Sequence, residues 1–445
     1  MTSRPAATSP GASAPAGAGR SSQDWRLVVA IYAATQVVEA YGVSQVYAFM
    51  PLYLQQLGLP PDQIARWVGI LGSFVFLLGL PLVPLWGVWA DKYSRKAVIM
   101  RSAIVEVAVF GGVALAREPW QFAVAMLLIG LQLGNTGVML AAIRDVTPRA
   151  RLGTAIAFFG AASGVGFALG PIVGGVLVDG LGLPLEAIYW SSAALTVGIV
   201  LLLWLGAREV RPEKVPTDPV IRLAFGAVRG VFTDRATVRI FALFFLALLA
   251  GQMARPYVPL LVTGVAGTGA GAAGAIGIVT GFAALVGALV SPVAGGIGDR
   301  IGFRPVLAGA LAIAAVTLVL MPLAAAVPGL AAGYGVIAAC QAATSAMIFG
   351  LLALEVPSER RSATLNLVYL PLYAAGIIGP AVGAVVAGVG VGAVFAVAGA
   401  VLAFGAVAAT MSARRSGPAV PAAAETAVAD DVIRELEADY PAELR

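Results

Sequence analysis

Glu39, Glu106 and Arg255 are ionisable residues that lie well inside long apolar stretches of this sequence. A charged group near the centre of a bilayer costs about 2.5–3.5 kcal/mol on insertion scales, so an ionisable residue there indicates function or pairing. Burial away from water favours the protonated form of a carboxyl group, and renewed contact with water or a cation favours release of the proton. A carboxyl group in this setting can therefore carry protons across a membrane.

Glu39 is the leading candidate for such a proton carrier. It follows Arg26 by thirteen residues, which is about 20 Å of helix at 1.5 Å per residue. Glu106 and Asp145 are the alternatives, although Glu106 would serve equally well as a structural partner or a neutral acid. Arg255 argues against Glu39 if the two lie together, because an arginine would hold the carboxylate in its charged form. A carrier at Glu39 favours cationic or neutral substrates.

Amide and aromatic side chains in the same apolar stretches can offer hydrogen bonds and flat walls to a small molecule. For each of them the alternative role is ordinary packing between helices. The candidates for a substrate cavity are Tyr41, Gln45, Asn135, Gln252, Arg255, Tyr257, Gln341, Asn366, Tyr369 and Tyr373.

Composition excludes several classes of function. The 445 residues include no histidine and one cysteine, Cys340, so histidine metal sites, histidine proton relays and internal disulfides are ruled out. The HExxH, GxSxG and Walker A patterns are also absent from the sequence. We therefore expect neither an enzyme nor an ATP-driven pump, and no cofactor or metal. The net charge of +5 is spread over short loops, which does not indicate nucleic-acid binding.

The composition instead indicates an all-α integral membrane protein. The chain is 60% hydrophobic and 11% charged, whereas soluble domains carry about 25% charged residues. Its apolar runs suit helices of about 20 residues that cross a bilayer. We predict twelve transmembrane helices: Leu27–Leu54, Val68–Trp86, Ala97–Leu115, Trp120–Ile143, Gly153–Leu177, Ala187–Leu205, Ile240–Val262, Gly271–Val293, Pro305–Leu323, Gly329–Leu354, Thr364–Ala387 and Val389–Met411.

The basic residues predict an orientation, because Lys and Arg accumulate in cytoplasmic loops. With the N-terminus inside, only Arg66 and Arg117 fall in outer loops, and Arg255 falls within a span. We therefore expect both termini in the cytoplasm and the chain in the inner or plasma membrane of a bacterial cell.

Short sequences recur at a nearly constant spacing. The stretch GVWADKYSRKAVIM, from Gly87, has a second copy in GGIGDRIGFRPVL, from Gly295, which is 208 residues later. MPLYL and VPLLV are also 208 residues apart, and the prolines of GFALGPIVGG and AGIIGPAVGA are 209 apart. This repeat predicts two pseudo-symmetric six-helix bundles that enter the membrane from the same side. We expect the bundles at 26–206 and 239–412, a cytoplasmic linker at 207–238, and cytoplasmic tails at 1–25 and 413–445, the first of them disordered.

These motifs resemble the major facilitator superfamily of transporters over about residues 25–413. The family's inner-loop pattern, Gly-x-x-x-Asp-(Arg/Lys)-x-Gly-Arg-(Arg/Lys), reads Gly87, Asp91, Lys92, Ser94, Arg95 and Lys96, with Ser94 replacing the second glycine. Its span-five pattern, Gly-Pro-x-x-Gly-Gly, reads Gly170, Pro171, Gly174 and Gly175. That pattern is typical of exporters, especially the twelve-span drug:proton antiporters. Met126 stands where many of those antiporters carry an arginine in span four, which leaves the usual coupling in doubt.

The resemblance implies that both motifs control opening and closing. Asp91 is expected to accept N–H bonds at the start of span eleven, where its charge meets the helix dipole, and Gly87 to allow close helix approach. Lys92 and Lys96 are equally well explained as topology signals. The span-five glycines leave a helix face almost free of side chains. The full gating set is Gly87, Asp91, Lys92, Arg95, Lys96, Arg144, Gly170, Pro171, Gly174, Gly175, Asp299, Arg300 and Arg304.

The function implied is a secondary active exporter of amphipathic, drug-like small molecules, working by alternating access in exchange for protons, as a monomer in the lipid bilayer. One alternative within the superfamily is a dedicated exporter of a metabolite or siderophore, or a nutrient importer. An alternative of another class is a receptor or scaffold that moves no substrate, for which Met126 is the motivation.

Overall fold

The computed structural model describes residues 24–212, 217–224, 235–355 and 370–415. Helices account for most of these residues, and no β-strand occurs among them. The helices of the first half of the chain are α1 (Trp25–Gln56), α2 (Pro61–Leu77), α3 (Gly79–Lys92), α4 (Arg95–Leu115), α5 (Pro119–Leu128), η1 (Ile129–Gln132), α6 (Asn135–Val146), η2 (Arg149–Arg151), α7 (Leu152–Gly175), η3 (Val176–Gly180) and α8 (Glu186–Gly206).

The second half contains the matching set, interrupted by the residues outside the described ranges. Its helices are α10 (Arg235–Ala254), η4 (Arg255–Tyr257), α11 (Val258–Ala266), α12 (Ala272–Ile301), α13 (Phe303–Leu320), η5 (Met321–Leu323), α14 (Val327–Glu355), α16 (Leu370–Val386) and α17 (Val391–Arg415).

The prediction of an all-α membrane protein is confirmed. Eleven helical segments of the described residues are long and apolar enough to cross a membrane. A twelfth, shorter apolar helix, Leu370–Val386, directly follows the undescribed residues 356–369. These twelve segments correspond one by one to the twelve predicted from the sequence.

Several spans are interrupted rather than continuous. Span four is α5, η1 and α6, and the break includes Gly134, whose φ of 97° is a left-handed conformation that glycine adopts without strain. Span seven is α10, η4 and α11, with Pro256 and Pro259 at the break. Proline lacks a backbone N–H and crowds the preceding turn, so regular α-helix is not maintained there. Both breaks free backbone and side-chain groups for other contacts.

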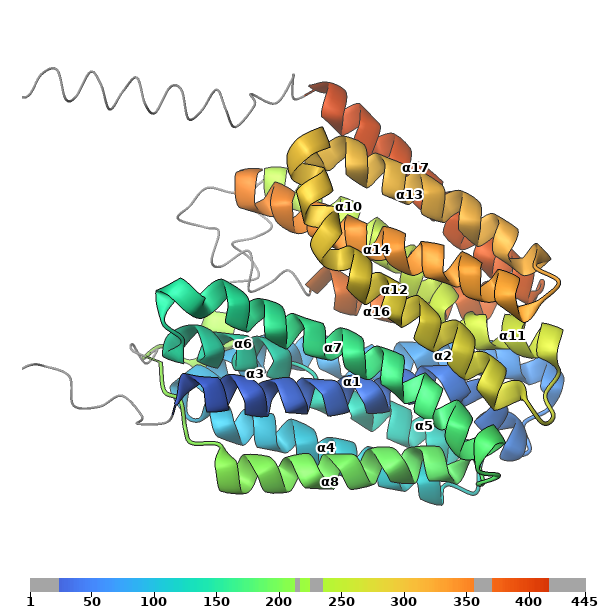
Figure 1. Ribbon diagram of the computed structural model, residues 1–445, viewed down its shortest axis with the longest axis horizontal. Coiled ribbons are helices and arrows are strands. Elements are labelled where there is room, and N and C mark those ends of the chain that lie inside the picture. The colour runs from blue at the N-terminus through green and yellow to red at the C-terminus, as the bar shows by residue number, and fades with distance from the viewer. Residues whose placement is uncertain (1–23, 213–216, 225–234, 356–369, 416–445) are drawn as a thin grey trace, which may run out of the picture.

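The helices pack as two groups. In the first, which we call the N-half (α1–α8), α1 packs against α7 and α8, and α4 packs against α8. In the second, the C-half (α10–α17), α12 packs against α14, α13 against α17, and α10 against α16. The two most extensive contacts between the halves are α7 with α12 and α2 with α16, and α1 also contacts α11 and α12. Figure 1 shows the N-half in blue to green below the C-half in yellow to red.

The two ends of this assembly differ. The described chain begins at Asp24 and ends at Arg415 at the same end, on the left of Figure 1, and we call this the terminal end. The halves spread apart there and converge toward the opposite end, which we call the far end. An even number of spans places the two chain ends together, as the repeat predicts.

Backbones meet directly in the contact between the halves toward the far end. A Cβ atom placed on Gly277 of α12 would lie 2.5 Å from the carbonyl oxygen of Pro171 on α7. The hydroxyl of Ser73 on α2 donates a 2.9 Å hydrogen bond to the carbonyl of Ile377 on α16. Near the terminal end, by contrast, a Cβ on Gly295 of α12 would meet no atom within 4 Å. The structure is therefore closed at the far end.

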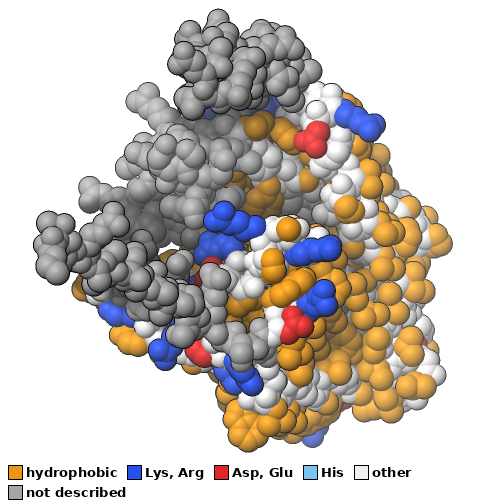
Figure 2. Space-filling model, turned by 60° about the vertical axis from the view of Figure 1, so that its left-hand side comes forward, with side chains coloured by type: hydrophobic (Ala, Val, Ile, Leu, Met, Phe, Trp, Pro, Cys, Tyr) orange, Lys and Arg blue, Asp and Glu red, His pale blue; other side chains and the backbone are white. Residues whose placement is uncertain are grey.

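The surface suits a bilayer. Large apolar side chains are exposed along the outer helices, including Trp204 of α8, Val316 of α13 and Phe404 of α17. Figure 2 brings the terminal end forward and shows described Lys and Arg side chains gathered there, beside a flank covered by apolar side chains. An apolar flank with basic residues at one end is the pattern of a helix bundle in a membrane.

The glycine contact between α7 and α12 predicts a specific sensitivity. Gly277→Val should lower the melting temperature of the detergent-purified protein, because the new side chain meets the backbone of α7; overpacking costs about 1–3 kcal/mol. Gly309→Val is the matched control, since Gly309 on α13 is exposed and has open space around it. Equal melting temperatures for the two variants would contradict the close contact.

Candidate functional site

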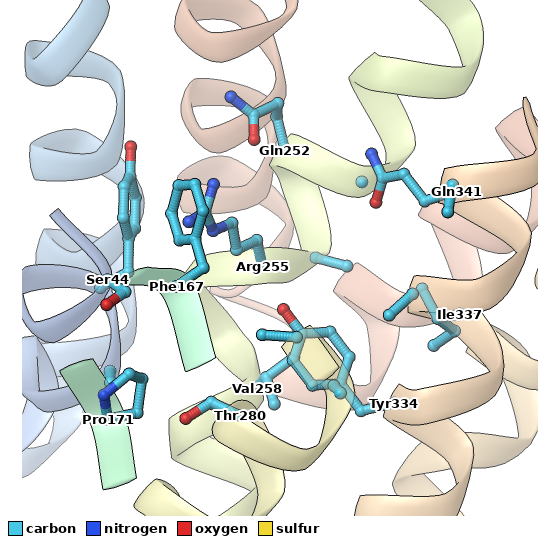
Figure 3. A pocket seen from close by; sticks show the side chains of 18 of the residues that line it. Ser44, Phe167, Pro171, Gln252, Arg255, Val258, Thr280, Tyr334, Ile337 and Gln341 are labelled. Carbon is cyan, nitrogen blue, oxygen red and sulfur yellow. The ribbon is translucent and has the colours of Figure 1, made fainter. Parts of the chain in front are cut away.

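A cavity of about 390 Å³ lies between the two halves (Figure 3). Predicted cavity residues Gln252, Arg255 and Gln341 line it. Other lining residues come from both halves: Ser44, Tyr47 and Ala48 of α1, Gly164, Phe167 and Pro171 of α7, Val258 of α11, Thr280, Ala283 and Ala284 of α12, Tyr334, Ile337, Ala338 and Ser345 of α14, and Leu372 of α16. The described residues contain no group of three or more His, Cys, Asp or Glu side chains that could hold a metal ion.

Arg255 owes its position in the cavity to the break in span seven. It is the first residue of η4, immediately before Pro256. Its guanidinium carbon lies 4.4 Å from the ring centre of Tyr47 and 5.1 Å from that of Phe167, both in the N-half. These cation–π contacts hold a charge from the C-half against two rings of the N-half. Figure 3 shows Arg255 beside Phe167, with Gln252 and Gln341 nearby.

Five other predicted cavity residues lie outside the cavity lining, because their side chains join helices instead. Tyr41 Oη and Ser191 Oγ share a 2.8 Å hydrogen bond between α1 and α8. Gln45 donates to the carbonyl of Gly170 at 3.1 Å and accepts from the hydroxyl of Ser192.

The side chains of the remaining three described residues also contact other helices and do not line the cavity. Asn135 donates to Glu39 inside the N-half. Tyr257 is fully buried, with its ring beside Gly383 of α16, and the ring of Tyr373 lies 6.1 Å from that of Phe76 on α2. The last two predicted residues, Asn366 and Tyr369, fall outside the described part of the chain.

The predicted proton-carrying acids Glu39 and Glu106 come together inside the N-half. Asn135 Nδ2 donates a 2.9 Å hydrogen bond to Glu39 Oε2. Glu106 of α4 is buried and close enough to Glu39 to interact with it electrostatically. Arg101, which is partly buried, also interacts electrostatically with Glu39. Neither acid lines the cavity between the halves. The structure thus separates the two acids from Arg255. The sequence alone could not decide whether Glu39 and Arg255 lie together.

Arg101 is a candidate that sequence reasoning did not single out. Its Nη2 donates to the carbonyl oxygens of Gln132 and Leu133, each at 3.2 Å, and to Ser102 Oγ at 2.7 Å. Its guanidinium carbon lies 3.9 Å from the centre of the Trp86 ring. The two carbonyls belong to the break in span four, where helical bonding is interrupted. An arginine shortly before a buried acid in one apolar run was the available signal.

The inner-loop motif forms an ion-pair network within the N-half. Arg95 is 1% exposed and pairs with Asp91 and Asp145, each at 2.8 Å. Arg144 pairs with the same Asp145 at 3.2 Å. Asp145 was predicted as an alternative proton carrier, but its place is in this network near the helix ends, away from the buried acids. A buried arginine needs such partners, since an unpaired charge there is strongly destabilising.

The linker supplies a cap to this network. The carboxylate of Glu209 accepts from Arg95 N at 2.8 Å and from Ser94 Oγ, at the N-terminus of α4. A negative charge there meets the positive end of the helix dipole. Lys96 Nζ donates to the carbonyl of Ala207 at 2.6 Å, and Lys92 Nζ to that of Asp218 at 3.1 Å. Both lysines therefore have specific partners besides any effect on topology.

The predicted latch joins Asp91 to the start of span eleven, which falls in residues 356–369, outside the described part of the chain, so the latch stays a prediction. Asp91 is paired with Arg95 of its own half, and a Cβ on Gly87 would meet no atom within 4 Å. Among the described residues, therefore, no neighbouring helix approaches Gly87 closely. In the second copy, Asp299 and Arg300 are exposed, while Arg304 has interactions of its own.

The span-five motif lies on two contacts. Gly170 and Gly174 of α7 face α1, where added Cβ atoms would meet Tyr41 and Phe49. Gly175 faces α12, where a Cβ would lie 2.9 Å from the carbonyl oxygen of Ala273. Missing side chains let three helices approach closely. This arrangement agrees with a role for the motif in joining the halves.

Asp179 forms a second contact between the halves that sequence reasoning missed. It lies in η3, directly after the span-five motif, and its two carboxylate oxygens accept from Gly271 N at 3.0 Å and Gly274 N at 2.5 Å. These are N–H groups at the start of α12, in the other half. A carboxylate at a helix N-terminus satisfies free donors and is attracted by the dipole. Asp179 therefore caps α12 across the far end.

This cap should hold the far end closed. Asp179→Asn removes the charge–dipole attraction, worth about 0.3–1 kcal/mol at an exposed site, so far-end opening should rise roughly two- to fivefold. The readout is a cysteine at Thr280, in the cavity, in a Cys340→Ser background. Its reaction with an impermeant thiol reagent from the far side should speed up by that factor.

Glu186→Gln is the matched control for this measurement. Glu186 lies at the same end, but its carboxylate accepts from Gln56 at 2.7 Å within the N-half. An equal effect of both substitutions, or no effect of Asp179→Asn, would show that the cap does not hold the far end.

Comparison with known proteins identifies the family to which this architecture belongs. The family model described as Major Facilitator Superfamily matches residues 32–288 and 240–438. Multidrug resistance protein MdtG of Enterobacter lignolyticus is 32% identical over 286 residues, which are 62% of this chain and 66% of that protein. MdtG of Yersinia enterocolitica is 30% identical over 289 residues, 63% of this chain and 67% of that protein.

Solved structures show the same fold at low sequence identity. A mutant form of the nucleoside transporter NupG has a TM-score of 0.70 at 16% identity, covering 87% of this chain and 99% of that one. The human organic anion transporter MFSD10 has a TM-score of 0.62 at 16% identity, covering 87% and 100%. The two helical halves, the repeated motifs and these matches lead to one conclusion: this chain belongs to the Major Facilitator Superfamily.

Proposed function

We propose that this protein is a secondary active exporter of amphipathic, drug-like small molecules, driven by protons and working by alternating access. The observation that carries the proposal is the cavity between two halves that are joined at the far end and apart at the terminal end. Such a cavity is one of the two states that alternating access requires. Kinship with proteins named for multidrug resistance, over about two thirds of their length, supports efflux of drug-like compounds.

Proton coupling is assigned to the buried acids of the N-half. Glu39 accepts a hydrogen bond from Asn135, at the start of α6 beyond the break in span four. Arg101 binds carbonyls in that same break. A change of proton occupancy at Glu39 can therefore act on the interrupted helix through two neighbouring groups. Arg255, which lies over Tyr47 and Phe167, leaves Glu39 available as a carrier.

Arg101 also bears on the departure at Met126. Met126 is fully buried among apolar residues of the N-half. The family's usual arginine would come from span four; here a guanidinium from span three contacts the span-four backbone. We propose that Arg101 takes the part of the missing arginine, which removes the motivation for a receptor that transports nothing.

The orientation, the division of the chain and the oligomeric state complete the proposal. Both termini face the cytoplasm of a bacterial cell, so the structure represents the inward-facing state. The bundles are 26–206 and 239–412, with the linker at 207–238. The protein works as a monomer in this proposal.

Transport in everted membrane vesicles tests the function. Everted vesicles carrying the protein should accumulate a fluorescent amphipathic dye when their interior is more acidic than the medium. A protonophore should abolish this uptake. Glu39→Gln, which resembles the permanently protonated acid, should reduce this uptake to the level of empty vesicles while dye exchange down its own gradient continues. The reason is that the glutamine side chain cannot release a proton.

Asp62→Asn is the control, since Asp62 is an exposed acid in the first turn of α2, at the far end. Full gradient-driven uptake by Glu39→Gln would remove Glu39 from the coupling mechanism. Uptake that ignores the protonophore in the unmodified protein would exclude proton-driven export.

Cysteine labelling tests the orientation. Tyr93 is 53% exposed at the terminal end and Leu181 is 65% exposed at the far end. In a Cys340→Ser background, Tyr93→Cys should react with an impermeant maleimide only in everted vesicles, and Leu181→Cys only in intact cells. The opposite pattern would reverse the topology.

A further inference from the structure

The central cavity has an unusual charge. Of the described residues that line it, Arg255 is the single charged side chain, and none is a carboxylate. The guanidinium group of arginine carries a delocalised positive charge. The cavity therefore carries one positive charge among apolar and neutral polar side chains.

The contacts of Arg255 leave its hydrogen-bonding capacity unused. Its partners are the faces of two aromatic rings, those of Tyr47 and Phe167. A guanidinium has five N–H donors, and a cation–π contact satisfies none of them. Within the described part of the chain Arg255 has no hydrogen bond and no ion pair. The rings therefore hold the side chain in place while its donors remain free for an acceptor.

The surroundings of Arg255 suit a small amphipathic molecule. The amides of Gln252 and Gln341 face the same space, as Figure 3 shows, and can add hydrogen bonds beside the guanidinium. Val258 and Ile337 are among the apolar residues that complete the wall. A volume of about 390 Å³ falls within the range of ligand pockets for drug-sized molecules.

We propose that this cavity selects amphipathic organic anions, with one acidic group bound to Arg255 and an apolar body against the aromatic and aliphatic wall. The inference rests on the proposed transport through this cavity and narrows its substrate class. It replaces the expectation of cationic or neutral substrates, which assumed that the proton-carrying acid faces the substrate. Planar guanidinium and carboxylate groups match in a two-bond geometry that a lone amide does not reproduce.

Separation of the two charged sites makes this selection compatible with proton exchange. Glu39 and Glu106 lie inside the N-half and do not line the cavity, so a bound anion meets the guanidinium without facing a carboxylate. An anion that leaves the cytoplasm also moves in the direction favoured by an inside-negative membrane potential. Export of an anion in exchange for an entering proton therefore uses both the potential and the pH gradient.

Three probes with the same ring system test the proposal: 1-naphthoate, 1-naphthamide and 1-naphthylmethylammonium. At pH 7.5 they differ mainly in the charge of one small group. With the detergent-purified full-length protein, 1-naphthoate should bind most tightly of the three. Arg255→Gln should weaken 1-naphthoate binding by about tenfold or more, since it removes a charged hydrogen-bond donor, and should leave 1-naphthamide binding nearly unchanged.

Two further variants separate binding from structure. Arg255→Lys keeps the charge and should recover part of the preference for 1-naphthoate over 1-naphthamide. Arg117→Gln removes an exposed arginine near the start of α5 and should bind all three probes as the unmodified protein does. Recovery by lysine would not follow if Arg255 served only to pack against the rings.

The vesicle assay distinguishes failure of this inference from failure of the transport proposal. Gradient-driven dye uptake that 1-naphthoate inhibits no better than 1-naphthamide would overturn anion selection and leave the exporter in place. The same holds if Arg255→Gln keeps the unmodified ratio of 1-naphthoate to 1-naphthamide affinity. Arg255-dependent binding of 1-naphthoate without uptake of any compound would support the anion site and overturn transport instead.

Discussion

The close contact of α7 with α12 is the constraint on which the rest of this structure depends. It exists because Gly175 and Gly277 have no side chains, so the backbone of one half lies directly against the other. Few side chains would have to change conformation if the two helices moved against each other. The contact is therefore suited to rocking of two rigid halves. Asp179 strengthens it from outside the apolar region, because its carboxylate caps α12 where water would otherwise reach the free N–H groups.

Closure at one end creates the cavity and decides what the inner-loop motif can do. With the halves apart at the terminal end, Arg95 is surrounded by Asp91, Asp145 and the linker's Glu209, all in or beside the N-half. Arg95 and Asp91 are therefore paired within the N-half in this state. Each end has a carboxylate at a helix N-terminus. Glu209 caps α4 of the N-half at the terminal end, and Asp179 caps α12 across the halves at the far end.

Interrupted helices distribute the charges that lie within the membrane. The break in span seven places Arg255 in the cavity, and the break in span four exposes carbonyls that Arg101 binds. Each break has a local cause, proline in one case and a left-handed glycine in the other. The result is a positive cavity between the halves and an acidic cluster within one half, so the proposed substrate site and the proposed proton site are separate.

The sequence by itself determined the architecture, because hydrophobic runs, basic loops and a 208-residue repeat are local or periodic properties of the chain. It also singled out Glu39, Glu106 and Arg255, since a charge in an apolar run stands out whatever its surroundings. Only the tertiary structure decided which of these groups meet. The direction of a side chain around a helix depends on packing and on helix breaks, so Tyr41 and Gln45 turned out to join helices rather than line the cavity. The backbone partners of Arg101 and Asp179 were hidden for the same reason, because every residue has such groups and no sequence pattern marks them as free.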